Sequence, residues 1–279
     1  KKKLPNVEFL NKPEGNYEVF NLKLYEVNTY AILEKKNSKK LLIYVEGHNG
    51  NPYNKLSFLK IKEKFKNQNY NILSLSTPLC GYNEDQDNFN FPGLIKSKYK
   101  KNSCVANREV WKEFKDPRYP NKNSLSLYLS GNYYLIDSLI NKYDHIKMTG
   151  FSTGGWFTTI ISALNTKINE SYSYAGTMPY PFNIYKSNYT TWMQEKSKIF
   201  LNHTYWDFYF LSTLDKNGLL NRDHFQLYNN KDRYMNDPSV SILKSYYDYL
   251  SPNKRFNIII YDYVGHDINL NEFSELMLR

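Results

Sequence analysis

The chain has 279 residues, of which 41% are hydrophobic and 23% charged, and it carries a formal net charge of +10. Its length and composition are those of an ordinary globular protein whose core needs neither disulfides nor metals, and they exclude a disordered or fibrous chain. No apolar run approaches the roughly 18 residues that a transmembrane helix needs. The lysines are spread in short blocks among asparagines, which indicates a solvated surface, so we expect no nucleic-acid partner.

The two cysteines and the N-terminal residue leave the compartment open. Cys80 and Cys104 are too few for a disulfide scaffold, and neither lies in a C-x-x-C pair of the kind that binds zinc. They are compatible with one disulfide in an exported protein or with two free thiols in an intracellular one. The sequence begins with Lys1 rather than Met, so it is also compatible with a removed signal sequence and a periplasmic or secreted location.

The first half of the chain contains short apolar segments that predict strands. The clearest is Lys40–Val45, a short apolar run closed by Glu46-Gly47-His48-Asn49-Gly50, as is typical of a buried parallel strand. Residue alternation and spacing predict further strands at 19–24, 30–33 and 70–76, and a helix at 55–65. Residues 77–123 are rich in Asn, Lys, Asp, Pro and Tyr without periodicity, and they predict a long irregular insertion.

The second half alternates predicted strands with predicted helices. The strands lie at 146–149, 171–177, 225–228 and 256–261, and the helices at 125–143, 156–164, 243–250 and from about 270 onward. Residues 178–221 predict a second irregular insertion. This alternation predicts an α/β fold with a mostly parallel sheet and helices on both faces. We expect a single domain over 1–279, in which the two insertions form a cap or lid.

The second insertion is notable for its aromatic residues. Its cluster comprises Trp192, Tyr205, Trp206, Phe208, Tyr209 and Phe210. Such a cluster predicts either a lid whose ring faces stack on a substrate or a small buried group beneath a loop. The sequence alone leaves both interpretations open, because the chain is rich in tyrosine throughout.

A glycine–serine motif lies between a predicted strand and a predicted helix. Gly150-x-Ser152-x-Gly154 in this context is typical of a nucleophile elbow, a turn too tight for side chains beside the serine. The turn lifts the serine hydroxyl above the carboxyl end of the sheet. There the amides of the following helix favour negative charge. Ser152 is therefore the candidate nucleophile.

The partners of such a serine are expected in a definite order, an acid after a later strand and then a histidine near the C-terminus. Asp232 and His266 meet this order, each directly following a predicted strand. His266 is the candidate base that takes the hydroxyl proton near pH 7, and Asp232 is the acid that sets the imidazole tautomer. Asp237 and Asp207 are weaker alternatives for the acid, and Asp267 is expected to be solvated.

Two backbone N–H groups are expected to form an oxyanion hole. One belongs to Thr153, directly after the serine, and the other to His48 or Asn49 in the loop after the first buried strand. Gly47 and Gly50 would let that loop approach the serine closely. The side chain of His48 has a second interpretation, as a substrate-binding group at the pocket mouth. This chemistry requires neither a metal nor an organic cofactor.

Together these residues resemble the α/β-hydrolase superfamily over about residues 40–270. The form Gly150-x-Ser152-x-Gly154-Gly155 is similar to that of the dienelactone-hydrolase, acetyl-esterase and prolyl-oligopeptidase-like branches, although the chain has no room for the oligopeptidase propeller. It departs from the hormone-sensitive-lipase branch, whose oxyanion loop reads His-Gly-Gly-Gly, because the loop here reads Gly47-His48-Asn49-Gly50.

The resemblance implies a serine hydrolase of carboxylesterase type, acting on a small-molecule ester through an acyl-enzyme intermediate. A serine peptidase or an acyltransferase would use the same three residues, so the bond that is cleaved stays open. A further alternative is a binding protein that keeps the fold without catalysis. The intact order of serine, acid and histidine favours an enzyme over that alternative.

Overall fold

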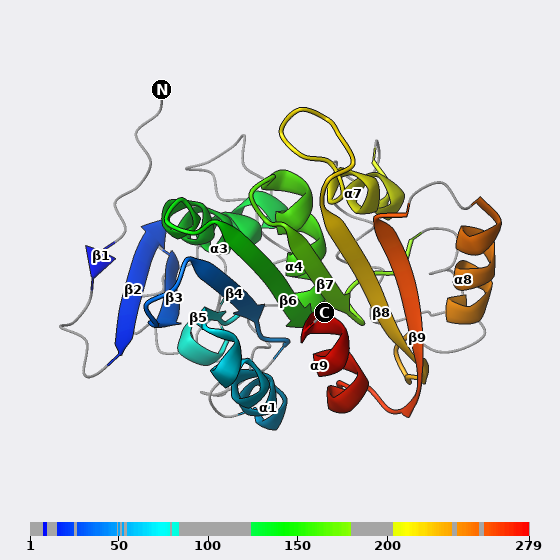
Figure 1. Ribbon diagram of the computed structural model, residues 1–279, viewed down its shortest axis with the longest axis horizontal. Helices are drawn as coiled ribbons and strands as arrows, with labels where there is room; N and C mark the ends of the chain where they lie inside the picture. The colour runs from blue at the N-terminus through cyan, green and yellow to red at the C-terminus, as the bar shows by residue number, and fades with distance from the viewer. Residues whose placement is uncertain are drawn as a thin grey trace.

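A single nine-stranded sheet forms the centre of the molecule (Figure 1). The computed structural model describes residues 8–9, 16–24, 27–48, 50, 52, 55–78, 80–83, 124–179, 203–235, 239–250 and 254–278. The strand order is β1-β2-β3-β5-β4-β6-β7-β8-β9. The strands are β1 (Glu8–Phe9), β2 (Tyr17–Leu24), β3 (Val27–Glu34), β4 (Lys40–Val45), β5 (Tyr70–Leu75), β6 (His145–Phe151), β7 (Glu170–Tyr174), β8 (Asp223–Lys231) and β9 (Phe256–Val264).

The sheet is antiparallel at one edge and parallel elsewhere. Strands β1, β2, β3 and β5 pair antiparallel, whereas β5, β4, β6, β7, β8 and β9 all run parallel. Five of the six residues of β4 and all six of β5 are buried. Burial on both faces explains why residues 41–45 read as an unbroken apolar run without alternation, whereas β5 also buries Asn71 and Ser74. The expectation of a mostly parallel sheet is confirmed.

Helices cover both faces of the sheet, as the alternation of elements predicts. The helices are α1 (Leu56–Phe65), α3 (Ser124–Ile140), α4 (Thr153–Leu164), α7 (Tyr205–Leu211), α8 (Ser239–Leu250) and α9 (Leu270–Leu278), with short 3-10 turns at Lys66–Gln68 and Gly81–Asn83. Helices α1 and α9 pack together on one face, while α3 and α4 lie on the other, with α4 against β6 and β7 (Figure 1). The part of the chain that the structure describes contains no helix long and apolar enough to cross a membrane.

Two described elements were not expected from the sequence, the two-residue strand β1 and the helix α7. Residues 178–221 were expected to be irregular, yet they contain α7, whose first turn is closed by a capping box between Thr204 and Asp207. The helix has only seven residues, and its aromatic side chains gave no clear helical period. Tyr205, Phe208 and Tyr209 are buried, so this part of the aromatic cluster belongs to the core. Trp192 lies outside the described residues.

Most of the two insertions lies outside the described residues, namely 84–123 and 180–202. The expected cap or lid therefore stays a prediction. Cys80, at the end of the loop after β5, is buried and takes part in a disulfide. Cys104, the only other cysteine of the sequence, lies outside the described residues.

A network of hydrogen-bonded polar side chains is buried in the core and links β7 and β8 to α4. The Nε2 amide of Gln226 lies 2.8 Å from His224 Nε2 and 2.9 Å from Thr159 Oγ1, and His224 Nδ1 lies 2.6 Å from Ser171 Oγ. Because the amide can only donate, His224 Nε2 is an acceptor and the ring is neutral. Burial, with a smaller effect of the Arg222 cation, lowers the pKa of His224 to about 3.

This buried histidine predicts a loss of stability in mild acid. The unfolded chain takes up the proton at the ordinary pKa of 6.5, whereas the folded chain resists it down to about 3. Stability is therefore complete above pH 6.5 and declines as the pH falls through this window. We expect His224 to lower the free energy of unfolding by about 2 kcal/mol between pH 7.5 and 5.

Urea unfolding of the wild type and of His224→Gln at both pH values measures this contribution. Glutamine has no proton to gain in this range, so the variant should lose about 2 kcal/mol less than the wild type. Parallel pH dependences in the two proteins would contradict the prediction. Glu170 does not interfere: burial would raise its pKa, but hydrogen bonds from His145, Tyr172 and Lys147 outweigh this and lower it to about 2, so its effect begins only near pH 4.5.

Candidate active site

The candidate residues follow strands that end at the same edge of the sheet. Ser152 follows β6, Asp232 follows β8 and His266 follows β9. Strand β4 lies directly between β5 and β6 in the sheet. From β4 the chain continues to β5 on one side, and it then crosses to β6 on the other side and continues outward to β9. In open α/β sheets, ligands bind outside the carboxyl ends of the strands at such a switch point.

The backbone at Ser152 has the geometry of a tight, strained turn. Ser152 adopts φ 55° and ψ −119° directly before α4, one of three non-glycine residues with positive φ in the described chain. Strain of this kind costs about 1–3 kcal/mol and persists only where the surroundings enforce it. Here the Ser152 N–H donates to the Tyr174 carbonyl at 2.8 Å.

The two glycines of the motif are required by close backbone approach. A Cβ on Gly150 would lie 2.3 Å from the Gly154 carbonyl oxygen, and a Cβ on Gly154 would lie 2.0 Å from the Val45 carbonyl oxygen. Neither backbone oxygen can move aside, so any larger residue would push α4 away from the sheet. The spacing Gly-x-Ser-x-Gly thus reflects how closely β6, α4 and β4 meet at this turn.

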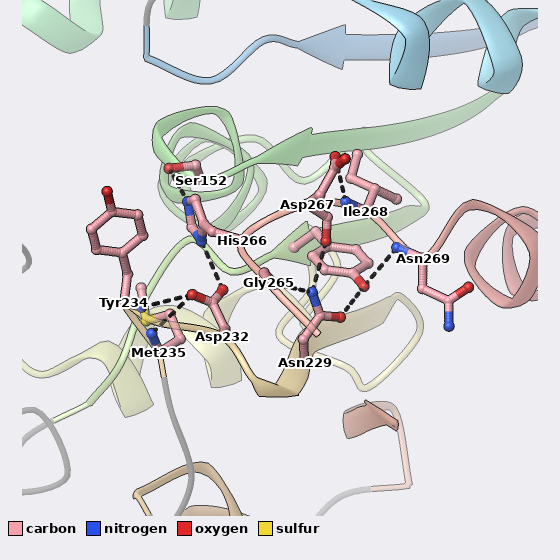
Figure 2. Close-up of polar contacts among 11 residues, drawn as sticks. Ser152, Asn229, Asp232, Tyr234, Met235, Gly265, His266, Asp267, Ile268 and Asn269 are labelled. Atoms are coloured by element: carbon pink, nitrogen blue, oxygen red, sulfur yellow. Dashed lines mark hydrogen bonds and ion pairs between the residues drawn. The ribbon is translucent and has the colours of Figure 1, made fainter. Parts of the chain in front are cut away.

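The structure brings Ser152, His266 and Asp232 into one line of hydrogen bonds (Figure 2). Ser152 Oγ lies 3.0 Å from His266 Nε2, and His266 Nδ1 lies 2.7 Å from Asp232 Oδ2. Asp232 is fully buried, and its other oxygen accepts the N–H groups of Tyr234 at 2.7 Å and Met235 at 3.3 Å.

These contacts determine the tautomer of the imidazole. A carboxylate that accepts backbone N–H bonds is an acceptor only, so the proton between Asp232 and His266 sits on Nδ1. Nε2 is then unprotonated, and the Ser152 hydroxyl donates to it. The arrangement can therefore transfer a proton from Ser152 to His266, while Asp232 stabilises the resulting positive charge.

Two further residues that sequence reasoning missed hold the histidine loop. Asn229, buried near the end of β8, donates from Nδ2 to the carbonyls of Gly265 at 2.8 Å and Asp267 at 2.7 Å. Its Oδ1 accepts the hydroxyl of Tyr174, and that hydroxyl accepts the Asn269 N–H at 3.0 Å. The only sequence signal was a polar residue at an otherwise buried strand position, which by itself indicates no function.

Aromatic rings also flank the imidazole. The ring of His266 lies 4.7 Å from that of Phe151 and 4.7 Å from that of Tyr234, with the Tyr234 ring nearly perpendicular. Phe151 is the residue before the serine, and Tyr234 is two residues after the acid. The imidazole is thus confined between side chains of the elbow and of the acid loop.

The alternative acids do not share this environment. Asp207 serves in the cap of α7, where its Oδ2 accepts the Thr204 N–H at 2.6 Å. Asp267 is exposed, as expected, and its Oδ1 accepts the N–H of Ile268. Asp237 lies outside the described residues. In the part of the chain that the structure describes, no group of three or more His, Cys, Asp or Glu could hold a metal ion.

The expected oxyanion residues lie around the elbow as far as the structure describes them. Thr153 is half-buried at the first position of α4, and His48 is half-buried in the loop after β4. Asn49 lies outside the described residues. Gly47 lies directly beside Ser152, because a Cβ on Gly47 would lie 3.4 Å from that of Ser152. The roles of Thr153 and of His48 or Asn49 as oxyanion donors stay predictions.

Comparison with solved structures supports the fold, whereas comparison of the sequence assigns no family. No family model matches the sequence, and neither does any curated protein. Among solved structures, the chain is similar to an esterase from Pyrococcus furiosus at 15% identity, with 98% of this chain and 94% of that chain covered and a TM-score of 0.56. The chain therefore has the α/β-hydrolase fold, as the sequence resemblance implies.

Two further structures share this fold. Est1E from Butyrivibrio proteoclasticus is 12% identical, covers 93% of this chain and 97% of its own, and gives a TM-score of 0.56. Acetyl xylan esterase 1 from a Thermoanaerobacterium species is 15% identical, covers 98% of this chain and 86% of its own, and gives a TM-score of 0.55. At these identities the likeness concerns the fold alone.

Proposed function

We propose that this protein is a serine hydrolase that cleaves carboxylic esters through an acyl-enzyme intermediate. The observation that carries the proposal is the line of contacts from Ser152 through His266 to the buried Asp232, at 3.0 and 2.7 Å. A serine that merely occupied a turn would need neither an unprotonated imidazole at its hydroxyl nor a buried acid behind that imidazole.

In the first step Ser152 Oγ attacks the carbonyl carbon of the ester while His266 Nε2 takes the hydroxyl proton. Asp232 keeps Nδ1 protonated and stabilises the imidazolium. The carbonyl oxygen becomes an oxyanion beside the amino end of α4, where the N–H of Thr153 and that of His48 or Asn49 would bind it. His266 then returns the proton to the alcohol, which leaves, and the acyl group stays on Ser152.

In the second step water takes the place of the alcohol. His266 removes a proton from the water molecule, which attacks the acyl carbon and forms the same type of oxyanion. Collapse of this intermediate returns the proton to Ser152 and releases the carboxylic acid. Each residue acts twice, and the chain needs no other proton acceptor for the cycle.

The names of the similar structures favour an ester over an amide. They include an acetyl xylan esterase, and Est1E is described with ferulic acid bound. By extension we propose an ester as the substrate of this chain. The acid and the alcohol that it joins depend on the pocket walls, to which residues 84–123 and 180–202 are expected to contribute.

A fluorophosphonate probe tests the proposed nucleophile. It reacts with an activated serine hydroxyl, so intact-mass analysis should show one adduct on the wild type and none on Ser152→Ala. Turnover of p-nitrophenyl acetate and of a matched acetyl p-nitroanilide then separates an esterase from a peptidase. A wild type that the probe does not label would contradict the proposal and favour the alternative of a binding protein without catalysis.

A further inference from the structure

Glu46 is a buried carboxyl group beside the expected oxyanion loop, and the catalytic steps above do not use it. It follows β4 and is 3% exposed. Its Oε1 accepts the Gly47 N–H at 2.8 Å, and its Oε2 accepts the Tyr44 hydroxyl at 3.0 Å. A buried carboxyl group is costly unless its hydrogen bonds compensate for lost water, so its position beside the loop calls for a physical reason.

The turn that begins at Gly47 touches the nucleophile elbow. A Cβ on Gly47 would lie 2.9 Å from the Phe151 carbonyl oxygen, so the two backbones are in direct contact. The Gly47 carbonyl accepts the Gly50 N–H at 3.2 Å. In a trans peptide the carbonyl and the next N–H point in opposite directions, so the His48 N–H points away from the interior of the turn.

The side chain of Glu46 fills the space beneath this turn. A Cβ on Gly50 would lie 1.8 Å from Glu46 Cγ and 2.6 Å from its Cδ. Glycine at position 50 is therefore required by the glutamate. The carboxyl group thus holds both ends of the turn: by a hydrogen bond at Gly47 and by packing at Gly50.

We propose that Glu46 is a positioning residue for the oxyanion hole. Its carboxyl group binds the Gly47 N–H and thereby sets the direction of the His48 N–H. Glu46 binds the N–H of Gly47, so Gly47 is not the donor, and the donor expected from the sequence is the next residue, His48. This inference rests on the proposed function, since an oxyanion forms only if Ser152 attacks a carbonyl group.

The role requires a hydrogen-bond acceptor and not a charge. A carboxylate near the oxyanion would oppose the negative charge that develops there. Burial raises the pKa of Glu46, against the lowering effects of the bonds from Gly47 and Tyr44. Of the other charges that face it, Lys55 before α1 lowers this pKa and Asp267 after β9 raises it. Glutamine, which keeps the acceptor without the charge, should therefore replace Glu46 well.

Two substitutions at position 46 separate the effect of the hydrogen-bond acceptor from the effect of the side-chain volume. Glu46→Met keeps the volume but removes the acceptor, so kcat for p-nitrophenyl acetate should fall about ten- to hundredfold, less than for a lost oxyanion donor. KM should change by less than about threefold, because the loop acts on the transition state. Glu46→Gln should retain kcat to within about threefold of the wild type, or exceed it.

Glu170→Gln is the matched control. Glu170 is a half-buried glutamate at the start of β7, at the opposite edge of the sheet, and it pairs with Lys147 at 2.9 Å. Its replacement should lower the Tm without changing kcat. This pattern is the signature of a purely structural carboxylate, whereas Glu46→Met should lower kcat at temperatures well below its Tm.

A kcat of Glu46→Met within twofold of the wild type would overturn the inference, and so would equal losses in the Met and Gln variants. If Glu46→Met does not fold, Gly50→Ala displaces the carboxyl group by sterics and should lower kcat similarly. An unchanged kcat there would also overturn the inference. Failure of the proposed function is distinguishable, because the wild type itself would then neither hydrolyse the ester nor react with the fluorophosphonate.

Discussion

Replacing Ser152 by alanine should lower kcat for ester hydrolysis by about a millionfold, because the variant loses the atom that forms the acyl-enzyme. The fold should persist, since the Ser152 backbone is held by Tyr174 and by the start of α4 whatever its side chain. Initial rates with p-nitrophenyl acetate measure the loss, and circular dichroism with a thermal scan reports the fold.

Ser138→Ala is the control for this substitution. Ser138 lies in α3, where its hydroxyl donates to the Leu135 carbonyl of the same helix at 2.7 Å. Its loss should change the rate by less than twofold. If Ser152→Ala kept more than about one part in ten thousand of the wild-type activity, Ser152 would not be the nucleophile.

Asp232→Asn should lower kcat about ten-thousandfold at pH 7 while leaving the backbone in place. The amide can donate to His266 Nδ1, which favours the tautomer with the proton on Nε2. That nitrogen then faces the Ser152 hydroxyl as a donor and cannot take its proton. The buried position of Asp232 strengthens the effect, because water cannot enter to substitute for the lost acceptor.

Asp267→Asn is the informative comparison, since Asp267 is the carboxylate adjacent to the histidine in the sequence. It is exposed and bonds the N–H of Ile268, so its change should reduce kcat less than tenfold. Steady-state kinetics of both variants at pH 7 distinguish the two acids. A larger loss for Asp267→Asn than for Asp232→Asn would contradict the assignment.

Local sequence patterns predicted most of the sheet and its helices. Strand β4 begins and ends where the apolar run does, and α1 and β5 differ from their predicted ranges by one residue at one end. Strand β4 was predictable because it is a short apolar run closed by glycines, and α1 because its apolar residues fall near helical spacing. Helix α7 was not, because it is short and apolar on most sides.

The sequence by itself determined the order of elements and three candidate residues, since glycine spacing encodes a tight turn and chain order encodes which loop follows which strand. Tertiary structure decided which groups meet. Ser152 and His266 are 114 positions apart, and His266 and Asp232 are 34 apart, yet all three are within hydrogen-bond distance. The separation of Asp232 from Asp207 and Asp267, and the positions of Glu46, Asn229 and Tyr174, depend on burial and strand order, which arise only when distant segments pack together.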